Sequence, residues 1–173
     1  MTRRPSNRKA QRDGQAAVEF AMVAAPFFFM LFAILELGLV FVTDSTMENA
    51  VQETGRLVRT GQAQASAMSA QTFKDEVCER MSLLANDCTN RTTIDVRVID
   101  QFRDVNPPDP MADGETFDDS ELVFQTGQPG SLILVRVWYE QPLITPFLSE
   151  GLSRLGNGEM VMTATTTFRN EPY

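Results

Sequence analysis

The stretch from Phe20 to Leu35 reads FAMVAAPFFFMLFAIL and contains no polar side chain. Apolar character resumes after Glu36 and continues to Val42. As a helix, residues 20–43 would be about 36 Å long, enough to cross a hydrocarbon core of roughly 30 Å. A buried core helix is the alternative, but the rest of this 173-residue chain could not surround such a helix on all sides. We therefore expect a single membrane span.

Charge divides the chain around this span. Residues 1–14 carry a side-chain charge of +4, whereas the remaining residues carry −12. The positive-inside rule then places the basic leader in the cytoplasm and the C-terminal body outside the membrane. A cleaved secretory signal fits less well, because the apolar stretch is long and only Thr43-Asp44-Ser45 offers a weak cleavage site. We expect three parts: a leader (1–14), a spine helix (15–61) and a periplasmic head (62–173).

Composition excludes several classes of function. The chain has no His and two Cys, which removes His-dependent catalysis and the common zinc sites. Its acidic balance argues against nucleic acid as a partner, since phosphate binding needs clustered Lys and Arg. There is no nucleophile elbow, phosphate-binding loop or dinucleotide fingerprint. We expect neither an enzyme nor a bound cofactor, and a membrane-anchored hydrolase is the weakest of the classes considered.

A small group of residues at the start of the span goes beyond a plain anchor. Gly14 ends the leader, and Glu19 stands one turn into the apolar helix. A carboxylate at that position is costly in lipid, although less so near the edge. By physics alone, Glu19 either reaches interfacial water and offsets the helix dipole or has a specific partner.

The sequence RDGQAAVEFA, from Arg12 to Ala21, resembles the N-terminus of TadE-like proteins. These are pseudopilins or minor pilins of the Tad (tight adherence, Flp-type) pilus system. The resemblance is specific over the first 50 or so residues, including ILELG at 34–38, and continues beyond them mainly in pattern. It implies cleavage by a prepilin peptidase after Gly14, which makes Gln15 the first mature residue and Glu19 the fifth.

The resemblance also implies a role for these residues in assembly. In pilins of this kind the fifth-residue Glu is thought to meet the new α-amino group of a neighbouring subunit, and Phe20 matches the aromatic position that follows it. The implied partners are the peptidase, other pilins and minor pilins, and an inner-membrane platform driven by an ATPase. The implied location is the bacterial inner membrane, with incorporation into the pilus left open. The alternative function is an uncleaved, single-pass anchored binding or adhesive module.

Two further residues stand out in the apolar helix. Pro26 removes a backbone hydrogen bond and predicts a kink or a melted turn, unless it is simply tolerated. Glu36 lies about 25 Å along the axis from Glu19, so the two carboxylates cannot share a partner. Glu36 either reaches water or is protonated, or it contacts another subunit or the assembly platform.

Periodicity beyond the span predicts an α+β head. Apolar residues at helical spacing extend the spine helix to about residue 60, with Gly61 as its end, and a second helix covers Ser69–Leu84. Alternating runs predict strands, and a short helix precedes the last of them. We expect a small, mostly antiparallel sheet of three or four strands packed on helices, as in pilins. The strands are Thr92–Ile99, Ser131–Tyr139 and Glu159–Phe168, and the short helix lies in Leu143–Leu155.

Two features of the head remain open. Cys78 and Cys88, with nine residues between them, form a disulfide in an oxidising compartment or are free buried thiols. Residues 103–121 contain seven acids and one Arg, which indicates a solvated loop or a partner contact. Calcium is disfavoured, because an EF-hand template starting at Asp109 puts Met111 and Ser120 at positions that require carboxylates.

Overall fold

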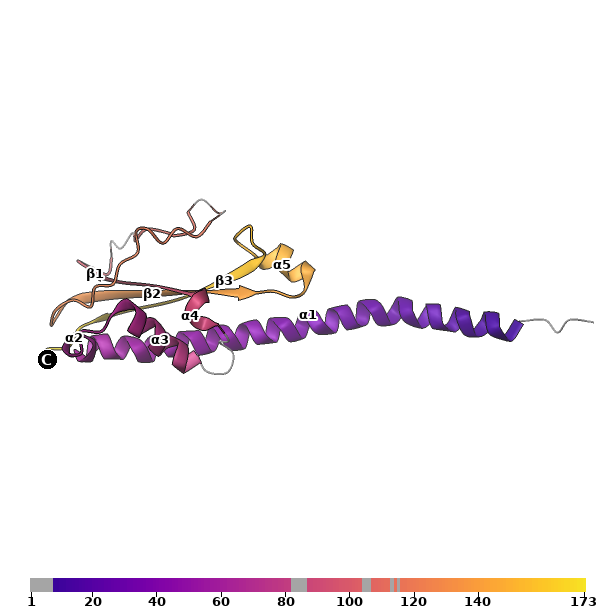
Figure 1. Cartoon of the computed structure of the whole chain (residues 1–173), viewed down its shortest axis with the longest axis horizontal. Helices are drawn as coiled ribbons and strands as arrows, with labels where there is room; N and C mark the ends of the chain where they lie inside the picture. The colour runs from indigo at the N-terminus through magenta and orange to yellow at the C-terminus, as the bar shows by residue number, and fades with distance from the viewer. Residues whose placement is uncertain (1–7, 82–86, 104–106, 113, 115) are drawn as a thin grey trace, which may run out of the picture.

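The computed structural model describes residues 8–81, 87–103, 107–112, 114 and 116–173. One long helix, α1, runs the length of the molecule, and the head packs on its C-terminal half (Figure 1). The elements in chain order are α1 (Arg8–Arg59), α2 (Gln62–Ala65), α3 (Ala70–Met81), α4 (Cys88–Arg91), β1 (Thr92–Ile99), β2 (Leu132–Pro142), α5 (Pro146–Leu152) and β3 (Glu159–Arg169).

The two halves of α1 have different surroundings. Its N-terminal half projects from the head (Figure 1), and its large apolar side chains are exposed. From Val40 onward one face is buried in the head, at the three- and four-residue spacing of an amphipathic helix. This confirms the expected continuation of the spine to about residue 60. The buried residues of this face are Val40, Thr43, Met47, Ala50, Val51, Thr54 and Val58.

The sheet lies across this buried face of α1. Within the described residues it has three strands in the order β1-β2-β3, and both pairings are antiparallel. The central strand β2 is buried on both of its faces from Leu132 to Tyr139, which matches its nearly unbroken apolar sequence. The expected α+β class and antiparallel sheet are confirmed.

Helix α3 completes the layer beneath the sheet. Its apolar face buries Phe73, Val77 and Met81, as the sequence predicts; Leu84, the last residue expected in this helix, lies outside the described residues. Cys78 on α3 and Cys88 at the start of α4 form a disulfide. In the chain-entropy account, a cross-link of this loop length contributes somewhat less than ~3 kcal/mol.

The outer face of the sheet is covered by the acidic segment that precedes β2. Trp138, Leu155 and Val161 form a second cluster with Met111 and Phe117 of that segment and with Leu122, which follows it. Its end also pairs with the edge of β1, since the Val96 N–H donates to Val123 O at 2.8 Å and the Gln125 N–H to Val96 O at 2.6 Å. The described residues of the segment form an irregular loop with Asp109, Asp118, Asp119 and Glu121 exposed, as expected. The packing of its apolar residues on the sheet was not predicted.

The turn after α1 depends on glycine. Gly61 has φ of +80°, and a Cβ added there would lie within 2.7 Å of Cδ2 in the ring of Tyr173. Helices commonly end at a glycine in this left-handed conformation, because other residues pay a steric cost there. Gly61 thus ends the spine and lets the C-terminal Tyr173 close over the turn.

We predict that Gly61→Ala destabilises the head more than Gly130→Ala. Both glycines have nearly the same positive φ (+80° and +81°), but a Cβ at Gly130 meets nothing within 4 Å. Gly130→Ala measures the cost of holding alanine at positive φ, which is about 1–2 kcal/mol. Any further decrease in unfolding free energy for Gly61→Ala measures the clash with Tyr173. Urea unfolding of the full chain in detergent, followed by Trp138 fluorescence, measures the unfolding free energy of both variants. An equal decrease in the two would show that Tyr173 packing on Gly61 does not matter for stability.

Candidate functional site

The residues expected at the processing and assembly site lie on the projecting half of α1. Gly14, Gln15, Glu19 and Phe20 are exposed, with Phe20 71% exposed. The Gln15 side-chain amide donates to Glu19 Oε1 at 2.8 Å, one helical turn away. The Glu19 carboxylate is therefore oriented by its own helix and faces outward, where a group from another molecule can reach it.

The apolar surface beside this site is extensive. Within the described residues, one helix is long and apolar enough to cross a membrane, and nearly all of its apolar window is exposed. Six Phe side chains from Phe20 to Phe41 lie on it. The core-helix alternative is therefore wrong, since a core helix would be enclosed by the fold. An exposed apolar surface of this size is typical of a membrane-spanning segment or of a contact with another protein.

Pro26 does not interrupt the helix. α1 stays helical on both sides of it, and Figure 1 shows a gentle bow in the projecting half in place of a break. The melted turn is absent, because neighbouring turns keep the helix continuous despite the lost hydrogen bond.

Glu36 has a partner within the chain that the sequence did not reveal. Its carboxylate accepts hydrogen bonds from the backbone N–H of Ile144 and from that of Thr145, the latter at 2.9 Å. These residues lie in the connection that leads from β2 into α5. The sequence left open whether Glu36 reaches water, is protonated or contacts another subunit. In the structure its carboxylate instead joins the spine helix to the head.

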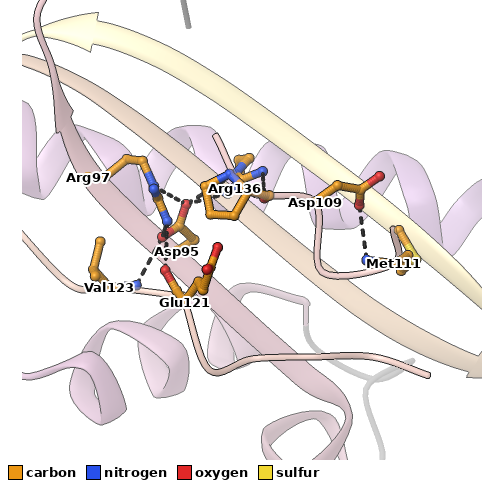
Figure 2. Close-up of polar contacts among 8 residues, drawn as sticks. Asp95, Arg97, Asp109, Met111, Glu121, Val123 and Arg136 are labelled. Atoms are coloured by element: carbon orange, nitrogen blue, oxygen red, sulfur yellow. Dashed lines mark hydrogen bonds and ion pairs between the residues drawn. The ribbon is translucent and has the colours of Figure 1, made fainter. Parts of the chain in front are cut away.

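A second polar cluster lies inside the head. Asp95 on β1 is fully buried and faces Arg136, its register partner on β2. Arg136 donates to Asp95 Oδ2 at 2.8 Å and Arg97 donates to the same oxygen at 2.7 Å, while the Val123 N–H donates to Oδ1 at 3.0 Å (Figure 2). The cluster thus joins two strands to the covering segment.

The arginines extend this cluster to the backbone of the acidic segment. Arg136 donates to Pro108 O at 2.9 Å and Arg97 to Glu121 O at 3.1 Å. The Arg136 guanidinium also lies 4.8 Å from the centre of the Trp138 ring. In Figure 2, dashed lines join Asp95 to Arg97 and Arg136, and these side chains lie beside the backbone of the segment. This arrangement is structural, because every charged group in it is bound to another part of the head.

The ion pairs set the titration of Asp95. Burial raises the pKa of this carboxyl, but hydrogen bonds from Arg97, the Val123 N–H and Arg136 outweigh burial and hold the pKa below its ordinary value. A lowered pKa in the folded state stabilises the fold above the unfolded-state value of 3.8, and this contribution is lost as pH falls through the folded-state pKa.

In the part of the chain that the structure describes, no three His, Cys, Asp or Glu side chains come close enough to hold an ion. Asp104, Asp113 and Glu115 of the acidic segment lie outside the described residues.

We predict that Asp95→Asn lowers the unfolding free energy at pH 7 by about 3–5 kcal/mol, since it leaves buried Arg136 without its counter-charge. The difference from the unmodified protein should shrink below pH 3.8, where the carboxyl of the unfolded chain is protonated. Urea unfolding at pH 7, 5 and 3.5 measures it, with exposed Asp100→Asn as control. A decrease in unfolding free energy as small as that of Asp100→Asn would show that the Asp95 cluster does not stabilise the head.

We predict that Glu36→Ala frees the connection after β2. A hydrogen bond to a charged acceptor contributes about 1.5–3 kcal/mol, so amide exchange at Ile144 and Thr145 should accelerate roughly tenfold or more. Hydrogen–deuterium exchange of the full chain in detergent tests this, with Glu48→Ala on an exposed site of the same helix as control. Unchanged exchange at both amides would show that the carboxylate does not hold this connection.

The comparisons with known proteins agree with the N-terminal motif. Residues 14–56 match the family model of TadE-like proteins, from the exposed Gly14 through the half of α1 that packs on the head. No curated protein and no solved structure matches the chain. Residues 14–56 are therefore similar to TadE-like proteins, which confirms the resemblance over this part of the chain.

Proposed function

We propose that the protein is a minor pilin or pseudopilin of a Tad-type pilus assembly machine. In this proposal a prepilin peptidase cleaves after Gly14, the basic leader stays in the cytoplasm, and the head lies in the periplasm. The protein acts in pilus initiation, assembly or tip structure, alongside other pilins and an inner-membrane platform. Its role is structural, with no enzyme activity.

The observation that carries this proposal is the TadE-like match beginning at Gly14, on a helix whose apolar half is exposed. Cleavage at that residue would create an α-amino group on Gln15, one turn from Glu19. A plain anchor would need neither the glycine junction nor a carboxylate at this depth. The basic leader supplies the orientation.

The two acids of the projecting helix differ in a way that supports the role of Glu19. Glu36 is already bound to the head, whereas Glu19 is exposed and, among the side chains that the structure describes, is hydrogen-bonded to its neighbour Gln15. An ammonium group from an adjacent subunit and the Glu19 carboxylate would each relieve the other's desolvation cost in a poorly hydrated site. The pair would also fix the axial register of neighbouring helices.

We predict that Glu19→Ala abolishes or strongly reduces piliation in the host while the protein accumulates in the membrane and is still cleaved. Electron microscopy of pili, immunoblotting and N-terminal sequencing give the three readouts. Glu48→Ala is the matched control, since it removes an exposed acid from the same helix beyond the span and should leave piliation unchanged.

Normal piliation by the Glu19→Ala strain would overturn the assembly role of this residue. Normal piliation combined with lost surface binding on deletion of the whole protein would favour the alternative, an anchored adhesive module. That alternative also requires that the leader remain attached.

A further inference from the structure

The connection between β2 and β3 reaches down beside the projecting half of α1. Figure 1 shows α5 at the end of the head that faces this projecting half. The hydrogen bonds from the backbone of Ile144 and Thr145 to Glu36 fix the connection at the height of Glu36. Its position relative to the apolar span can therefore be calculated along the helix axis.

Glu36 lies below the outer end of the apolar stretch. Asp44, the next charged residue, is eight positions further on, or about 12 Å higher along the helix. Measured from Glu19, Glu36 is about 25 Å up a hydrocarbon core that is roughly 30 Å thick. If Glu19 marks the inner edge of the membrane, the connection reaches the boundary between the acyl chains and the headgroups of the outer leaflet.

The chemistry of the connection suits this depth. Ile144 is 89% exposed and Phe147 is 68% exposed, and Pro146 between them is also exposed. We call these three residues the apolar tip. Residues 141–149 carry no charged side chain, although the chain as a whole is strongly acidic. Leu148 of the same turn packs inside the head. The exposure of Ile144, Pro146 and Phe147 is therefore specific to the outer side of this turn.

We propose that the apolar tip inserts into the outer leaflet of the membrane that α1 spans, as a second contact between the protein and lipid. This inference rests on the membrane anchoring in the proposed function and adds a surface to it. The tip continues the exposed apolar surface of α1 at the same height, so one lipid environment covers both. Glu36 remains shielded there, because its carboxylate is bound by the backbone of the connection while the apolar side chains face lipid.

The second contact has a mechanical consequence. The apolar length of a single helix does not by itself set its tilt, which depends on packing and on anchors at the membrane interface. With the tip held at the interface and Glu36 joining it to α1, the head is held at one height above the membrane. The other end of the head, near Phe102, would then point away from the surface.

The test uses the full chain with a fluorescent nitrobenzoxadiazole label on single cysteines introduced as Phe147→Cys, Phe102→Cys and Phe28→Cys. The native Cys78–Cys88 disulfide leaves no competing thiol. Phe102 is the matched control, because it is a 57% exposed apolar residue on the head, and Phe28 reports the span itself. Each protein is reconstituted in phosphatidylcholine–phosphatidylglycerol vesicles with and without brominated acyl chains.

We expect the label at 147 to emit further to the blue than the label at 102 and to lose most of its fluorescence to brominated lipid, as the label at 28 does. A label at 147 that behaves like the one at 102, while 28 is quenched, overturns the tip alone. An unquenched label at 28 overturns the membrane anchoring as well. Quenching at 147 that changes when the protein is diluted in lipid shows a second copy on the tip and overturns the assignment to lipid.

Discussion

The whole structure depends on one helix that serves two environments. The first half of α1 exposes large apolar side chains and is long and apolar enough to cross a membrane, while its second half supplies one wall of the core of the head. The two halves are a continuous helix through Pro26 and Glu36. The apolar half is therefore joined to the head without a break in the helix.

The contact at Glu36 reinforces this coupling. It joins the head to the helix below the level at which their apolar packing begins at Val40. Without it, the connection before α5 would be a free loop beside the span. With it, the connection is hydrogen-bonded to α1 at Glu36, beside the exposed Ile144 and Phe147.

Local patterns in the sequence predicted most of the fold. The spacing of Met47, Val51, Thr54 and Val58 gave the packed face of α1, and strict alternation gave β1 with its observed ends at Thr92 and Ile99. These features are decided by neighbours within one element, so a single sequence contains them. The N-terminal motif was readable for the same reason, since Gly14, Glu19 and Phe20 lie within one short segment.

Long-range polar contacts were not predictable in this way. Glu36 meets residues more than one hundred positions later in the chain, and only the strand register brings Asp95 to Arg136. A charged residue inside an otherwise apolar strand, as at Arg136, was the available signal for that pair. The packing of the acidic segment on the sheet was not predicted either, because only Met111 and Phe117 in it, and Leu122 just after it, make that contact among many charged residues.

The state of the N-terminus tests the central claim most directly. Protein isolated from membranes of a host that contains an active prepilin peptidase should begin at Gln15, with the leader through Gly14 removed, as N-terminal sequencing would show. A protein that still begins at Met1 under these conditions would contradict the account of a processed pilin-like subunit.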